Sequence, residues 1–275
     1  MYIVAAALGF SLMTFFVRIA GDLPTMEKAF FRNLVAVFVA AFMLIKSGEK
    51  FEIKNGCKVD VFFRCLFGTS GLIANFFAID NLGIADANML NKMSPFFAII
   101  ASIFLLKEKP SKVDVMATII AFIGVLFIVR PTGNIAVVPS LIGLYGGFAA
   151  GVAYTFVRRL GKKGEKTAVI VFCFSVFSTL VTLPGMIMNF EPMKWWQFLL
   201  LLAAGLSATL GQFGITSAYR YAPAKDISVY DYTQVLFAAI LGMLFLSEIP
   251  HFMSIIGYVI IIGVAVLRWK KLRQY

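Results

Sequence analysis

The chain is a series of long apolar runs separated by short polar segments. A hydrocarbon core about 30 Å thick requires about 20 apolar residues in a helix. Ten runs approach this length, and they are continuous instead of alternating, which favours membrane helices over the strands of a transmembrane barrel. The predicted spans are 2–20, 28–46, 59–79, 85–106, 113–130, 139–158, 167–189, 195–218, 226–247 and 252–269.

The pattern of the first half recurs in the second half after a shift of 140 residues. Gly68–Pro110 aligns on Ala208–Pro250 without a gap, so that Gly71 falls on Gly211. Such self-similarity indicates one structural unit used twice. Each unit has an odd number of spans, so the second must enter the membrane from the opposite side. We therefore predict an all-α integral membrane protein with ten transmembrane helices in two inverted five-helix repeats, 1–133 (helices 1–5) and 139–270 (helices 6–10).

Composition supports a membrane protein and excludes several other classes. Of the 275 residues, 60% are hydrophobic and 14% charged, whereas soluble domains have about 45–50% apolar and about 25% charged residues. The chain has a single histidine, and its three cysteines lack metal or disulfide spacing, which argues against a structural zinc site and a haem ligated by two histidines. We expect no cofactor, no metal and no catalytic residues, and hence no enzyme.

The net charge of +11 is explained by membrane topology. Basic residues gather at the ends of apolar runs, as the positive-inside rule requires, so no nucleic-acid partner is expected. With a cytoplasmic N-terminus, 19 of the 25 lysines and arginines lie in cytoplasmic segments and six outside. We predict that both termini are cytoplasmic. The basic segment KEKPSK (107–112) and its counterpart SEIPHF (247–252), which has no lysine or arginine, agree with the inversion.

Polar residues inside the spans are costly and indicate either function or helix association. Small residues such as Gly143, Gly147 and Gly151 favour close helix contact. Larger polar groups, most of them on the third, fourth, eighth and ninth helices, are candidates for a central cavity. The predicted substrate-binding residues are Thr14, Asn75, Asn88, Asn91, Lys92, Tyr154, Gln212, Tyr230, Asp231 and Gln234, with aromatic rings such as Phe76 and Phe77 beside them.

Lys92 and Asp231 are the most informative of these residues. Asn91 and Asp231 occupy the same position in the two repeats, so pseudo-symmetry would place them across a shared interior, with Lys92 close to Asp231. An embedded ammonium beside a carboxylate relieves part of each group's desolvation cost. Three interpretations stay open: a substrate-binding pair in a cavity, a structural ion pair, or a position at the level of the lipid headgroups.

The motif LGIADAN, followed by SPFFA, LKEKP and then GVLFIVRP, lies within residues 82–131. With the ten inverted helices, it resembles the EamA-type branch of the drug/metabolite transporter superfamily over the whole chain. The second repeat departs from the pattern, with Val235 in the place of Pro95. The resemblance implies a carrier that works by alternating access through a central cavity. It names no substrate, because members carry amino acids, nucleotide-linked sugars and other small solutes.

We therefore predict a secondary transporter of a small polar metabolite, amino-acid-like or nucleoside-like, with a non-transporting scaffold or a lipid-handling protein as the alternative. The partners are the substrate, the lipid bilayer and, as an open alternative, a coupled proton or a counter-substrate. Small four-helix relatives use a carboxylate in the first helix, but Tyr2–Ala20 contains none. By resemblance, the expected location is a bacterial cytoplasmic (plasma) membrane, crossed many times.

Overall fold

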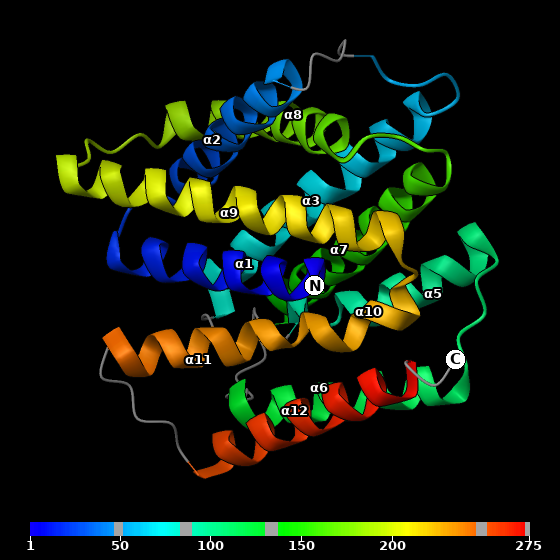
Figure 1. Ribbon diagram of the computed structural model, residues 1–275. Helices are drawn as coiled ribbons and strands as arrows, with labels where there is room; N and C mark the ends of the chain where they lie inside the picture. Colours follow the sequence, from blue (N-terminus) through cyan, green and yellow to red (C-terminus); the bar gives the residue numbers. More distant parts are fainter. Residues whose placement is uncertain (47–51, 83–89, 130–136, 246–251, 273–275) are drawn as a thin grey trace.

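The predicted apolar runs form helices along nearly the whole chain (Figure 1). The computed structural model describes residues 1–46, 52–82, 90–129, 137–245 and 252–272, and this part of the chain contains no strand. Its helices are α1 Tyr2–Ile19, α2 Thr25–Lys46, α3 Lys58–Leu82, α5 Ser94–Leu106, α6 Lys112–Val129, α7 Val137–Lys162, α8 Thr167–Met188, α9 Trp195–Tyr221, α10 Ala224–Asp231, α11 Thr233–Phe245 and α12 Phe252–Leu272.

These helices confirm an all-α membrane protein whose ten spans form two inverted five-helix repeats. Within the described residues, seven stretches are long and apolar enough to cross a bilayer, and α5 and part of α12 are shorter apolar helices. The predicted ends are close to the observed ones, except that α7 continues past residue 158 to Lys162. Arg159, beyond the predicted end of this span, therefore lies on the same helix as Arg158.

The two repeats interlock, and their helix pairs occur in symmetry-related sets. In the repeat, α1 corresponds to α7 and α3 corresponds to α9. Accordingly, α1 packs along α9 and α7 packs along α3, while α2 packs on its own counterpart α8. α6 and α12, another equivalent pair, lie side by side at one edge of the bundle (Figure 1). The closest helix pairs thus join one repeat to the other, which leaves the interior of the protein between the repeats.

The fourth and ninth spans are interrupted, whereas the sequence predicted continuous helices over 85–106 and 226–247. In the second repeat, α10 ends at Asp231 and α11 begins at Thr233. In the first, a helix ends at Asn91, and a turn at Lys92 and Met93 precedes α5. The two breaks lie at equivalent positions of the repeat.

Different forces produce the two breaks. In the first repeat, a proline ring clashes with the carbonyl four residues earlier, so Pro95 disfavours helix at Asn91. The second repeat has Val235 there, and tertiary hydrogen bonds stabilise the break instead. The Tyr232 hydroxyl donates to the Lys92 carbonyl at 3.3 Å, and the Ser11 hydroxyl donates to the Gln234 carbonyl at 2.8 Å.

Two glycines of α7 allow the break in the first repeat to pack directly against that helix. A Cβ added at Gly151 would lie only 2.7 Å from the Ser94 carbonyl oxygen, and one added at Gly147 only 2.6 Å from the Leu90 carbonyl oxygen. Side chains at these positions would push the two backbones apart. The glycines therefore have the close-packing role that their four-residue spacing predicts.

Candidate functional site

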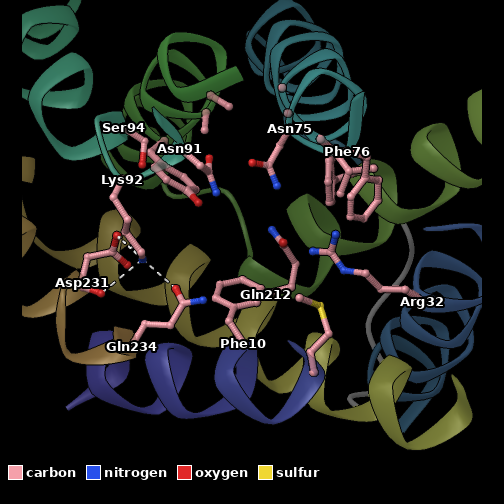
Figure 2. Close-up of a pocket in the computed structure, with 18 of the residues that line it drawn as sticks. Phe10, Arg32, Asn75, Phe76, Asn91, Lys92, Ser94, Gln212, Asp231 and Gln234 are labelled. Carbon is pink, nitrogen blue, oxygen red and sulfur yellow. Dashed lines mark hydrogen bonds and ion pairs between the residues drawn. The ribbon is translucent and has the colours of Figure 1, made fainter. Parts of the chain in front are cut away.

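A cavity of about 150 Å³ lies between the two repeats. It receives side chains from α1, α2 and α3 of the first repeat, from α7, α8 and α9 of the second, and from both helix breaks. Figure 2 shows amide, ammonium, carboxylate and guanidinium groups that point into one space. The breaks therefore bring backbone and side chains of the fourth and ninth spans to the middle of the interior.

Lys92 and Asp231 form an ion pair on one side of this cavity (Figure 2). The Lys92 Nζ lies 3.4 Å from Asp231 Oδ2 and donates to Gln234 Oε1 at 2.7 Å. The two charged side chains are only 11% and 9% exposed, so the pair is buried within the protein. Lys92 lies at the break of the first repeat and Asp231 at the break of the second, so the ion pair joins the two equivalent helix breaks.

Most of the predicted binding residues that the structure describes line this cavity. They are Asn75, Asn91, Lys92, Tyr154, Gln212, Asp231 and Gln234, together with the ring of Phe76. Tyr154 also stacks on Tyr219, with 4.6 Å between the ring centroids. Residues from six different helical segments thus converge, as expected for a site formed by the fold and not by one local motif.

Two predicted residues, Thr14 and Tyr230, do not line the cavity, and a third lies outside the described residues. Thr14 is exposed, and its hydroxyl donates to the Phe10 carbonyl of its own helix at 2.9 Å. Tyr230 packs at the edge of the apolar core instead. Neither residue lines the cavity, which the sequence could not show because helical spacing alone did not fix which side of α1 and α10 faces inward. Of the two aromatic rings predicted to lie beside the site, Phe76 lines the cavity, whereas Phe77 does not and is 41% exposed. Asn88 lies outside the described residues.

The sequence analysis missed two cavity residues with charged side chains, Arg32 and Arg64. Both lie within the predicted spans 28–46 and 59–79, but each is counted in the topology as a basic residue of one side of the membrane and not as a cavity residue. Arg64 is in fact only 2% exposed, and its guanidinium lies over the Phe174 ring, 4.2 Å from the centroid. Arg32 extends from α2 into the cavity (Figure 2). If Arg64 is left out of the cytoplasmic group and Arg32 out of the outside group, most lysines and arginines still lie in cytoplasmic segments.

A periodic signal on α3 could have identified Arg64. Arg64, Gly68, Gly71 and Asn75 follow one another at intervals of four, three and four residues, and all of them line the cavity. This spacing places them on one face of a helix. Once Asn75 is predicted to face inward, the same periodicity predicts that Arg64 does so too.

A layer of ion pairs joins the two repeats at one end of the bundle. Asp60 of α3 pairs with Lys163 at 2.7 Å and Arg159 at 3.5 Å. Glu108, after α5, pairs with Lys162 at 2.7 Å and Arg158 at 3.2 Å. Both carboxylates belong to the first repeat and all four cations to the second. We call this group the charged layer: Asp60, Glu108, Arg158, Arg159, Lys162 and Lys163.

The other end of the bundle contains a second and larger cavity of about 640 Å³. It is lined by the start of α2, by α3 and by the segment after α8. The charged layer and the larger cavity thus lie at opposite ends of the bundle, and Phe76 borders both the central and the larger cavity.

Comparison with known proteins agrees with this architecture. The EamA-like transporter family matches residues 1–130 and 138–269. The chain belongs to this family. It is 32% identical to the pseudopaline exporter CntI of Pseudomonas aeruginosa over 273 residues, which are 98% of this chain and 95% of that protein.

Other relatives extend the similarity. An uncharacterized transporter of Helicobacter pylori is 29% identical, with 88% of this chain and 84% of that protein covered. Solute carrier family 35 member G1 of Mus musculus is 26% identical, with 98% and 78% covered. A crystal structure superposes with a TM-score of 0.83 at 18% identity, covering 98% of this chain and 97% of that one, and so supports the fold. The EamA family chain is therefore a multi-pass membrane transporter with bacterial relatives.

Proposed function

We propose that this EamA family protein is a secondary transporter of a small polar metabolite, amino-acid-like or nucleoside-like, which binds in the central cavity. The observation that carries the proposal is the Lys92–Asp231 pair, buried at two interrupted helices and exposed to the cavity between the inverted repeats. Interrupted helices at the interface of inverted repeats are a common way to build transporter binding sites. Charged groups within a bilayer are costly and are retained where they bind substrates or ions.

Alternating access follows from the difference between the two ends of the cavity. The repeats, 1–133 and 139–270, are proposed to be the units that move. In the conformation described here, four ion pairs between the repeats close one end. Opening that end requires these pairs to separate, while the space near Phe76 closes. With cytoplasmic termini, the charged layer faces the cytoplasm and this conformation opens outward.

The residues around the cavity also argue against the alternative functions. A non-transporting scaffold or lipid-handling protein has no need of an ion pair, four amides and two arginines around an internal cavity. No enzymatic activity is expected, since the carboxylate in this cavity is already paired with Lys92. Asp231 is the first candidate for proton coupling, and exchange with a counter-substrate is the competing mode.

Transport by purified protein in proteoliposomes tests the proposal. We expect Lys92→Ala and Asp231→Asn each to abolish uptake of solutes that raise the melting temperature of the unmodified protein, because a ligand that binds only the folded state stabilises it. Unchanged transport rates in both variants would refute the assignment of the site.

Two controls separate a binding role from a structural one. Thr14→Ala changes a predicted residue that lies off the cavity, and it should leave transport unchanged. The double variant Lys92→Gln/Asp231→Asn removes both charges and so avoids an uncompensated buried ion. If the double variant folds but does not transport, the pair acts in binding; if it transports normally, the pair is only structural.

A further inference from the structure

The central cavity carries more positive than negative charge. Arg32, Arg64 and Lys92 line it, and Asp231 is the one acidic side chain among the lining residues that the structure describes. Because Asp231 pairs with Lys92, the two guanidinium groups remain without a carboxylate. We propose that the substrate of the transporter is an organic anion with at least two carboxylates, which Arg32 and Arg64 bind. This inference rests on the proposed transport function and specifies its substrate class.

Arg64 is held in place but is not neutralised by the protein. Its guanidinium lies flat over the Phe174 ring, at 4.2 Å from the centroid. Gly68, one turn later on α3, permits this position, because a Cβ there would collide with Arg64 Nη1. The buried Arg64 Nε has no hydrogen-bond partner among the described residues. A guanidinium carries five N–H donors, and leaving them unpaired in a buried site is costly.

Arg32 supplies the second cation from a different helix. Figure 2 shows its guanidinium inside the cavity, beside Gln212 and opposite the Lys92–Asp231 pair. Among the described residues, no carboxylate forms an ion pair with Arg32 or Arg64. Two cations from two helices can each take one carboxylate of the same molecule. A substrate with two carboxylates would therefore balance the excess charge within the membrane.

The chemistry of arginine favours carboxylates. The planar guanidinium binds carboxylate or phosphate oxygens through two parallel hydrogen bonds, which a lysine cannot do. The cavity of about 150 Å³ is smaller than the about 300–1,000 Å³ of sites for drug-sized ligands, so the ligand must be compact. Amides of Asn75 and Gln212 are available for its other polar groups. Phosphate esters share the oxyanion chemistry and are a separate arm of the test.

The test compares probes of matched size and different charge. Thermal stabilisation and binding calorimetry of the full-length protein in detergent would use succinate, succinamide, putrescine, aspartate, asparagine and phosphoserine at constant ionic strength. We expect succinate and aspartate to bind at least about tenfold more tightly than succinamide and asparagine, because hydrogen bonds to charged groups are stronger than neutral ones. Phosphoserine as the tightest binder would instead assign the arginines to phosphate, against the proposal.

Variants connect the effect to the two arginines. Arg32→Gln and Arg64→Gln should each weaken succinate binding by about 10- to 100-fold, whereas the matched control Arg159→Gln, in the charged layer, should not change it. Arg64→Lys should restore only part of the affinity, since it keeps the charge but loses the planar fork. If neutral and zwitterionic probes bind as well as succinate, the anion inference fails and the transport proposal stands. If none of the probes binds or is transported, both fail.

Discussion

The charged layer and the central cavity use the same kinds of side chain in opposite ways. In the layer, each of the two carboxylates has two cations within 3.5 Å. In the cavity, three cations share one carboxylate. Every cation of the layer thus has a carboxylate partner within the protein, whereas in the cavity, among the residues that the structure describes, only Lys92 has one, and Arg32 and Arg64 are left for a ligand. We expect the paired cations of the layer to hold the repeats together and the unpaired arginines of the cavity to select the substrate.

The cations of the charged layer and those of the cavity also differ in their exposure to solvent. Arg159, Lys162 and Lys163 have side chains that are 41%, 42% and 37% exposed, so water can solvate them when their ion pairs separate. Exposed pairs contribute little to stability, about 0–1 kcal/mol each. Arg64, by contrast, is 2% exposed. The cations of the layer can therefore be solvated when their pairs separate, whereas the buried Arg64 still requires an anionic partner.

The largest expected effect comes from removing both carboxylates of the charged layer. Asp60→Asn/Glu108→Gln should favour opening at that end and expose Cys57, which is 1% exposed at the start of α3. Burial, and then the nearby Glu165 carboxylate, raises the pKa of the Cys57 thiol and keeps its reactivity low. With up to four ion pairs lost, we expect maleimide labelling of Cys57 to become about 10- to 100-fold faster.

The measurement requires Cys57 to be the only thiol, so Cys65 and Cys173 are replaced by alanine in all variants. Labelling that stays equally slow in the double variant would show that the layer does not control access. In cells, the side from which an impermeant maleimide reaches Cys57 also tests the predicted cytoplasmic position of this end.

An intermediate effect is expected from Gly68→Ala, which moves a charge in the cavity without removing it. The new methyl group would collide with Arg64 Nη1 and lie 2.9 Å from the Phe174 ring, so Arg64 must leave its position. Such crowding typically costs about 1–3 kcal/mol, and we expect succinate to bind about five- to tenfold more weakly.

Gly263→Ala is the matched control for this substitution. A Cβ at Gly263 meets nothing within 4 Å, so binding and stability should be unchanged. If Gly68→Ala binds succinate as the unmodified protein does, the position of Arg64 over Phe174 is irrelevant to the ligand.

The smallest expected effect is that of a single exposed cation of the layer. Lys162→Ala leaves Glu108 paired with Arg158, and the lost partner is 42% exposed. We expect the free energy of unfolding to fall by less than about 1 kcal/mol, with transport changed less than twofold. A large loss in denaturant unfolding experiments would mean that the layer is a rigid support, and the contrast with the cavity would disappear.

The candidate site could be predicted where repeat and helical spacing agree. Asn91 and Asp231 were paired by the repeat, and Lys92 followed from its neighbour, so this side of the cavity needed no coordinates. Thr14 lies off the cavity, which the sequence could not show because an apolar helix surrounded by lipid and protein gives no signal for its inward face. Arg32 and Arg64 were missed because a basic residue near the end of an apolar run has the same pattern whether it snorkels to the surface or turns inward.

The sequence by itself determined the lipid environment, the ten spans, the inverted duplication and the family resemblance. These properties depend on long-range averages of hydrophobicity and on self-similarity, which are present in the chain before it folds. Only the tertiary structure decided where the fourth and ninth helices break, which cations have carboxylate partners and at which end of the bundle ion pairs join the repeats. The reason is physical: Tyr232, Ser11 and Glu108 act through partners 140, 223 and 50 residues away, and only packing brings them into contact.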